Sequence, residues 1–271
     1  MDLKTKDIQL QYEGFLNTPQ LWENNEVFEL QQFELPKIKT PIFEGILQKN
    51  QRLGKRVESF LSHQLKQDAT AKILVENTQI QNGKITVGEL DFLIETYKNP
   101  VHLEVIYKFY LYDASVGKNE LDYWIGPNRR DSLVAKLNKL KNKQLPLLYN
   151  PLTKNLLSKL NLKSENIEQQ VLFKAQLFIP YKTTNIQFKA LNNNCVNGFY
   201  INFNELQELK TCKFYIPSKI NWLQEIQTQT NWQSFEKFFQ KIEVFFNQKS
   251  APLCWLKYPN GETKKFFVVW W

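Results

Sequence analysis

The sequence predicts an α/β (α+β) protein in which helices flank a central mixed β-sheet. Residues 88–111, GELDFLIETYKNPVHLEVIYKFYL, alternate between the two faces of a strand and contain a polar turn, which is typical of a β-hairpin. From residue 50 to residue 180, the spacing of apolar residues gives the order helix, three strands, helix, strand. Elements in this order pack as helices against a sheet.

The first elements of this order precede the hairpin. RLGKRVESFLSHQLKQ, residues 52–67, is predicted to be an amphipathic helix because apolar residues recur at helical spacing. These apolar residues are Leu53, Val57, Phe60, Leu61 and Leu65. AKILVENTQI, residues 71–80, is predicted to be a strand, and the turn QNGK leads from it into the hairpin.

The last elements follow the hairpin. WIGPNRRDSLVAKLNKLKNKQ, residues 124–144, is expected to begin as a loop and to continue as a helix. Asn128 is the predicted N-cap, and Asp131 three residues later completes an approximate capping box. EQQVLFKAQLFIPY, residues 168–181, is predicted to be a long strand.

The C-terminal third is rich in aromatic residues. NWQSFEKFFQKIEVFF, residues 231–246, has an apolar stripe at helical spacing, which we interpret as core packing rather than as a ligand surface. Residues 251–271 are predicted to form a closing hairpin around Asn260 and Gly261. We expect this region to pack on the central sheet as a subdomain.

Length and composition indicate a globular protein. The chain has 271 residues, of which 42% are hydrophobic and 14% aromatic, enough for a substantial core. The predicted organisation is an N-terminal extension over residues 1–45 that packs on the core, a core over 46–185, and a C-terminal α+β subdomain over 186–271.

The formal net charge of +8 favours an anionic partner, with nucleic acid, and DNA in particular, the first expectation. Cys195, Cys212 and Cys254 are scattered, and together with His63 and His102 they show no spacing typical of a disulfide framework or a zinc site. No signal peptide and no apolar run of about 20 residues is apparent. We therefore expect a cytoplasmic protein that does not associate with membranes; the sequence leaves open whether it has a protein partner.

The predicted hairpin contains three charged residues, Asp91, Glu104 and Lys108. A loop of two residues (98–99) or four residues (97–100) would place all three on one face, whereas an odd-length loop or a bulge would not. One interpretation is a metal and acid–base site. The alternative is a half-exposed sheet with ordinary surface charges.

The element order, with Asp91 on one strand and Glu104 and Lys108 on the next, resembles the core of the PD-(D/E)XK nuclease superfamily. The strings GELDFL, HLEVIYKFYL, WIGPNRRDSLVAKL and KQLPLL also resemble a bacterial family known as domain of unknown function 1853, over most of the chain. This resemblance implies a restriction-endonuclease-like core with an aromatic-rich C-terminal α+β extension.

The resemblance also implies a chemistry. Asp91 and Glu104 would bind Mg²⁺ or Mn²⁺ through carboxylate oxygens, and Lys108 would position the attacking water or stabilise the transition state. Glu58 on the first helix would be a further metal ligand; the alternative for Glu58 is a solvated helix charge. The implied function is Mg²⁺-dependent hydrolysis of phosphodiesters in DNA or RNA.

One departure from the superfamily pattern concerns the lysine. The usual motif is E-x-K, whereas this chain has Glu104-Val-Ile-Tyr-Lys108, with Ile106 where the lysine is expected. On a straight strand the Cα atoms of Glu104 and Lys108 would lie roughly 13 Å apart instead of about 6.6 Å. An inactive descendant of a nuclease is therefore an alternative.

Other residues are predicted to support nucleic-acid binding. The basic residues at the start and along the helix after GPN are expected to contact phosphates, the alternative being a solvated helix face. They are Arg129, Arg130, Lys136 and Lys139. Trp124 would stack on a base or serve as a packing anchor. Gln144 is a further polar member of the predicted site. His102 is interpreted as marking the sheet edge, the alternative being a catalytic base.

Two further function classes compete with the nuclease. One is a non-catalytic nucleic-acid-binding module that keeps a basic groove. The other is an interaction scaffold, which predicts a large exposed apolar patch within residues 200–271.

Overall fold

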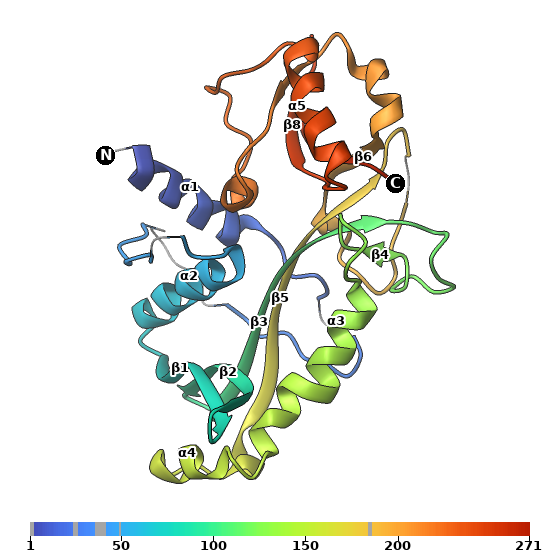
Figure 1. Ribbon diagram of the computed structural model, residues 1–271. Coiled ribbons are helices and arrows are strands. Elements are labelled where there is room, and N and C mark those ends of the chain that lie inside the picture. Colours follow the sequence, from blue (N-terminus) through green and yellow to red (C-terminus); the bar gives the residue numbers. More distant parts are fainter. Residues whose placement is uncertain (1–2, 24–26, 36–41, 49, 184–185) are drawn as a thin grey trace. The chain divides into compact units, whose positions relative to one another are not determined.

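The computed structural model describes residues 3–23, 27–35, 42–48, 50–183 and 186–271 of the chain. It is an α+β protein with a large mixed sheet flanked by helices, as predicted (Figure 1). Its α-helices are α1 (Leu3–Asn17), α2 (Leu53–Gln67), α3 (Leu133–Lys139), α4 (Lys154–Lys159) and α5 (Phe235–Asn247).

The strands are β1 (Ala71–Asn82), β2 (Ile85–Thr96), β3 (Val101–Tyr112), β4 (Trp124–Ile125), β5 (Glu168–Pro180), β6 (Val196–Asn202), β7 (Lys213–Tyr215), β8 (Leu253–Lys257) and β9 (Thr263–Val269). They are hydrogen-bonded in the order β1-β2-β3-β5-β6-β9-β8-β7, with β4 paired to β3.

The chain forms two compact units, each built from separate stretches of sequence. We call Trp22–Tyr107 with Ala135–Lys174 the hairpin unit. The aromatic unit comprises Met1–Leu21, Lys108–Val134 and Ala175–Trp271. The predicted boundary at residue 185 lies outside the described residues.

The predicted hairpin is confirmed. β2 and β3 are antiparallel, with Phe92 opposite Leu103 and Ile94 opposite Val101, and the four residues 97–100 link them. This is the longer of the two even-length loops. Asp91 follows one step beyond Phe92, and Glu104 one step beyond Leu103, so the alternation of side chains puts both carboxylates on one face.

The helix predicted at residues 52–67 is also confirmed, as α2. Val57, Phe60, Leu61 and Leu65 are buried on its apolar stripe, and this burial is what holds a helix of this length in place. Glu58, directly after Val57, is buried as well, which is unusual for a carboxylate without a functional or structural reason.

The helix after GPN begins later than predicted, at Leu133. Asn128 is not its N-cap, because the Asn128 side chain accepts a hydrogen bond of 2.8 Å from the backbone N–H of Ala251. The backbone N–H of Gly126 instead donates to the carbonyl of Asp131 at 2.8 Å, which closes a loop before the helix. After α3 the chain continues as a π-helical turn, Leu140–Gln144, and a 3-10 turn, Leu145–Tyr149.

In the aromatic unit, α5 buries its apolar stripe, as the sequence predicts. Phe235, Phe238 and Ile242 belong to its core, and the rings of Phe214 and Phe238 stack at 4.1 Å. Gly261 has φ +90 in the turn between β8 and β9, which explains the glycine of the closing hairpin. The C-terminal strands continue the sheet beyond β5 rather than packing on its face, because β6 pairs in parallel with both β5 and β9.

The exposed surface of the C-terminal region does not favour an interaction scaffold. Among residues 200–271, all of which the structure describes, Val244 is the single exposed large hydrophobic residue. Across the described residues, no helix is long and apolar enough to cross a bilayer.

Candidate metal site and its polar neighbours

Three carboxylates converge in the hairpin unit, from Glu58 on α2 and from Glu89 and Asp91 on β2. One oxygen of each lies within 4.8 Å of the others. Glu89 and Asp91 are two residues apart on a strand and therefore point to the same face, the face toward which α2 turns Glu58. The structure thus brings together two of the three predicted metal ligands and adds Glu89.

Asp91 is held rigidly within this cluster. Its Oδ2 accepts a hydrogen bond of 2.9 Å from the backbone N–H of Val105 on β3, and its residue exposure is only 9%. Burial, and next the negative charge of Glu104, raise the pKa of Asp91 to about 8. The carboxylate therefore lacks enough positive charge nearby to hold it ionised at neutral pH.

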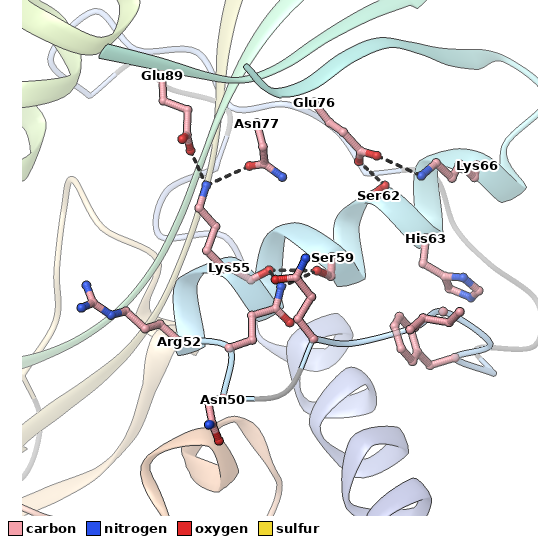
Figure 2. A pocket seen from close by; sticks show the side chains of 15 residues that line it. Asn50, Arg52, Lys55, Ser59, Ser62, His63, Lys66, Glu76, Asn77 and Glu89 are labelled. Carbon is pink, nitrogen blue, oxygen red and sulfur yellow. Dashed lines mark hydrogen bonds and ion pairs between the residues drawn. The ribbon is translucent and has the colours of Figure 1, made fainter. Parts of the chain in front are cut away.

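Among the described residues, the ammonium that contacts these carboxylates is that of Lys55 on α2. Figure 2 shows its side chain pointing toward Glu89 and Asn77. Its Nζ is 2.8 Å from Oε2 of Glu58, contacts Oε1 of Glu89, and donates to Oδ1 of Asn77 at 2.9 Å. Burial lowers the pKa of Lys55, but the hydrogen bonds and charges of Glu58 and Glu89 outweigh this effect, and the pKa is raised.

Asn77 has an unusual backbone conformation for a strand. It lies in β1 between the pairs Glu76–Phe92 and Thr78–Leu90, with φ +52. Asparagine adopts this left-handed region more readily than most residues, at some cost in strain. The conformation is associated here with the hydrogen bond that the Asn77 side-chain oxygen accepts from Lys55 beside the cluster.

The charges in the cluster do not balance. Burial raises the pKa of Glu58, and the ammonium of Lys55 offsets this effect only in part. One ammonium thus faces three carboxylates, two of which are more than nine-tenths buried. When all three carboxylates are ionised their negative charge exceeds that of one ammonium, and such a set of oxygens suits a hard divalent cation such as Mg²⁺ or Mn²⁺.

Glu104, the third predicted ligand, lies next to this cluster with both oxygens hydrogen-bonded. Oε1 is 3.1 Å from Nε2 of His102, and Oε2 accepts from the amide of Gln144. Nε2 of Gln169 lies 3.2 Å from Nδ1 of His102, so the amide donates there and His102 donates to Glu104 through Nε2. Both His102 and Glu104 have 0% exposure.

The fully buried position of His102 shows that its interpretation as a marker of the sheet edge is wrong. β3 lies between β2 and β5 in the sheet and is therefore a central strand. A histidine is stable there because both ring nitrogens have hydrogen-bonding partners.

The π-helical turn explains how Gln144 reaches Glu104. Lys136 Nζ donates to Oε1 of Gln144 at 2.7 Å, although the two residues are eight apart in sequence. In a regular α-helix, residues eight apart point roughly 80° away from each other. The wider turn at Leu140–Gln144 changes this angle, and such turns are frequent at functional sites.

Lys108 belongs to the aromatic unit, where its Nζ is 2.6 Å from Oδ2 of Asp131. Ile106, at the position where the superfamily pattern has its lysine, has 3% exposure. Lys108 thus forms an ion pair with Asp131, and its predicted catalytic role stays a prediction.

The predicted nucleic-acid-binding residues have different surroundings. In the aromatic unit, Arg129 donates to Asp113 at 2.8 Å, and its guanidinium lies 4.5 Å from the ring centre of Trp271. Arg130 is exposed there, as is Lys139 in the hairpin unit. These two are the residues of the set most available to a phosphate.

Trp124 has 0% exposure and packs between Tyr112 and Phe188, with ring centres 5.4 and 5.0 Å away. Its ring is therefore not accessible for stacking on a base. These surroundings fit the alternative interpretation of Trp124 as a packing anchor.

A pocket of about 610 Å³ in the hairpin unit opens beside the cluster (Figure 2). Lys55 and Glu89 line it, together with Arg52 and with Lys66, which forms an ion pair of 3.2 Å with Glu76. Lys55 and Glu89 face this pocket, whereas Glu58 and Asp91 are not among its lining residues.

Sequence reasoning missed Glu89 and Lys55 as members of the site, although both had a local signal. Glu89 is two residues before Asp91 and shares its strand face. Lys55 is three residues before Glu58, a spacing at which side chains meet on a helix.

The model of a family described as a domain of unknown function (DUF1853) matches residues 13–269. Neither a curated protein nor a solved structure matches the chain.

Proposed function

This chain belongs to the DUF1853 family, and we propose that it is a Mg²⁺- or Mn²⁺-dependent phosphodiester hydrolase acting on DNA or RNA. The observation that carries the proposal is the convergence of Glu58, Glu89 and Asp91 within 4.8 Å, next to the buried Glu104. The element order helix, three strands, helix, strand around these residues supports the same proposal through its resemblance to the nuclease superfamily.

The residues fit a divalent cation. The cluster offers carboxylate oxygens, the ligands that Mg²⁺ and Mn²⁺ prefer. Asp91 is fixed by the Val105 N–H, so binding a cation would cost little side-chain entropy at this residue. Glu58, Glu89 and Asp91 would hold the ion, which would supply charge stabilisation at a bound phosphate.

The chain's own residues would then orient the reaction. Hydrolysis forms a bond from a water oxygen to phosphorus and breaks the ester bond to the leaving oxygen. The proton lost by the water is matched by one gained by the leaving oxygen through solvent. His102 and Gln144 would hold the carboxylate of Glu104 in place beside Asp91.

The test combines metal binding with cleavage by the 271-residue chain. Millimolar Mg²⁺ or Mn²⁺ should raise the melting temperature by mass action, and Asp91→Ala should abolish this increase. Labelled single- and double-stranded DNA and RNA should be cleaved by the wild-type protein with metal and not with a chelator.

The outcomes separate the alternatives. Metal-dependent stabilisation without cleavage of any of the four substrates would overturn the hydrolase and favour a non-catalytic module derived from a nuclease fold. If neither metal changes the melting temperature and no substrate is cleaved, the cluster is a structural set of charges and the proposal fails altogether.

A further inference from the structure

The cluster lacks a lysine at the usual place on β3, yet it has one on α2. Ile106 stands where the superfamily pattern has its lysine, and the described contact of Lys108 is with Asp131 in the other unit. The ammonium of Lys55 is within 2.8 Å of Glu58 and contacts Glu89, two of the three proposed metal ligands. Glu58 and Glu89 are thus already paired with a positive charge of the protein itself, the ammonium of Lys55.

The position of Lys55 also gives it access to the pocket. Its side chain is 42% exposed, whereas that of Glu58 is 11% exposed. Lys55 and Glu89 line the pocket of about 610 Å³, and Figure 2 shows the Lys55 side chain reaching from α2 toward Glu89 and Asn77. A lysine has a flexible four-carbon stem, and because Lys55 lines the pocket, rotation about the bonds of this stem can turn its ammonium from the carboxylates toward the pocket.

We infer that Lys55 is the resident counter-ion of the acidic cluster and, once a divalent cation displaces its ammonium, the catalytic lysine that contacts the phosphate. The inference rests on the proposed function and deepens it. The displaced ammonium donates hydrogen bonds to a non-bridging phosphate oxygen, where negative charge increases in the transition state. It transfers no proton, so the balance of the hydrolysis is unchanged.

Competition between two cations for the same oxygens has a measurable consequence. A divalent ion must break the contacts of Lys55 with Glu58 and Glu89 before it binds both. Removing the ammonium therefore strengthens metal binding while it weakens catalysis. A lysine with a merely structural role would show no such opposite changes.

The experiment measures Mn²⁺ affinity by calorimetry and cleavage by the same preparation, for the wild type and Lys55→Met. We expect Mn²⁺ to bind the variant about fivefold more tightly, since an ion pair near the protein surface contributes at most about this factor. Cleavage should fall about 100-fold, the usual loss when one charge-stabilising donor is removed.

Lys66 provides a matched control on the same helix. It lines the same pocket and pairs with Glu76 at 3.2 Å, but it does not contact the three carboxylates. Lys66→Met should change neither Mn²⁺ affinity nor cleavage by more than about twofold. If Lys55→Met fails to fold, Lys55→Gln keeps N–H donors toward Asn77 without the charge and should give the same two changes.

Unchanged or weaker Mn²⁺ binding in the Lys55 variants would overturn the counter-ion, and undiminished cleavage would overturn the catalytic role while leaving the proposed function intact. A wild-type protein that binds Mn²⁺ but cleaves nothing would remove both the hydrolase and the catalytic role of Lys55. Tighter Mn²⁺ binding by the Lys55 variants would then still support the counter-ion.

Discussion

Oδ2 of Asp91 accepts a hydrogen bond of 2.9 Å from the backbone N–H of Val105, which ties the carboxylate on β2 to the neighbouring strand β3. This bond favours the ionised carboxylate, yet burial and the charge of Glu104 are stronger and raise the pKa of Asp91 to about 8. The folded protein therefore holds a proton on Asp91 at pH values where the unfolded chain has lost it.

The first prediction concerns the pH dependence of stability without metal. Because the folded pKa is raised from 3.8 to about 8, the contribution of Asp91 is most favourable below the lower value and is lost as the pH rises toward the higher one. Asp91→Asn keeps an acceptor for Val105 and does not titrate. With a chelator present, the wild type should lose stability relative to this variant as the pH rises, by up to about 1.4 kcal/mol per pH unit.

Denaturant unfolding at several pH values between 4.5 and 8 measures this difference directly. A constant difference between the two proteins across the range would show that Asp91 is ionised in the folded state. The pKa assigned to its burial and to Glu104 would then be wrong.

The second prediction concerns Glu89. Its carboxylate is one of the three within 4.8 Å, so Glu89→Gln should reduce the Mn²⁺-dependent rise in melting temperature by at least half, since one of three ligand charges is lost. Glu95→Gln is the matched control, because Glu95 lies on the same strand but pairs with Lys72 at 3.7 Å. An equal loss in both variants would mean that Mn²⁺ responds to net charge and not to this cluster.

The predictability of the hairpin and the unpredictability of its contacts have the same physical origin. Alternation along β2 and β3 is local, so the even-length loop and the shared face of Asp91 and Glu104 follow from the sequence. The same alternation places Glu89 beside Asp91. Glu89 becomes part of the acidic cluster only because α2 brings Glu58 to that face, and this is a tertiary contact.

The partners of Glu104 and Lys108 also come from distant segments. Gln144 reaches Glu104 through a π-helical turn, which a period of 3.6 residues does not predict. Asp131 pairs with Lys108 because the backbone around Gly126 closes a loop where the sequence predicts a capped helix. Sequence spacing alone therefore grouped Lys108 with Asp91 and Glu104, whereas in the structure Lys108 pairs with Asp131.

The third prediction concerns the bond from Gln144 to Glu104. Gln144→Leu would leave Oε2 of the fully buried Glu104 without this donor, which should destabilise the fold by roughly 1–3 kcal/mol. Asn142→Leu, at an exposed position in the same π-helical turn, should change stability by less than about 0.5 kcal/mol. Thermal and urea unfolding compare the two; similar losses would show that the turn itself, and not the hydrogen bond, is sensitive.

The last prediction concerns nucleic-acid binding through phosphates. Among the described residues, Arg130 and Lys139 form no ion pair or side-chain hydrogen bond, whereas Arg129 is held by Asp113 and Lys136 by Gln144. Arg130→Ala and Lys139→Ala, made separately, should each weaken binding similarly across sequences. Each should lower the slope of log affinity against log salt by about 0.9 for duplex DNA, because one phosphate contact and its released counterion are lost.

Arg129→Ala separates binding from folding. Its guanidinium is engaged by Asp113 and lies over Trp271, so this variant should lower the melting temperature, while Arg130→Ala should not. Fluorescence anisotropy with labelled DNA and RNA at several salt concentrations measures the slopes. Binding that does not depend on salt, or slopes unchanged in both the Arg130 and the Lys139 variants, would rule out these residues as phosphate contacts and place any nucleic-acid surface elsewhere on the chain.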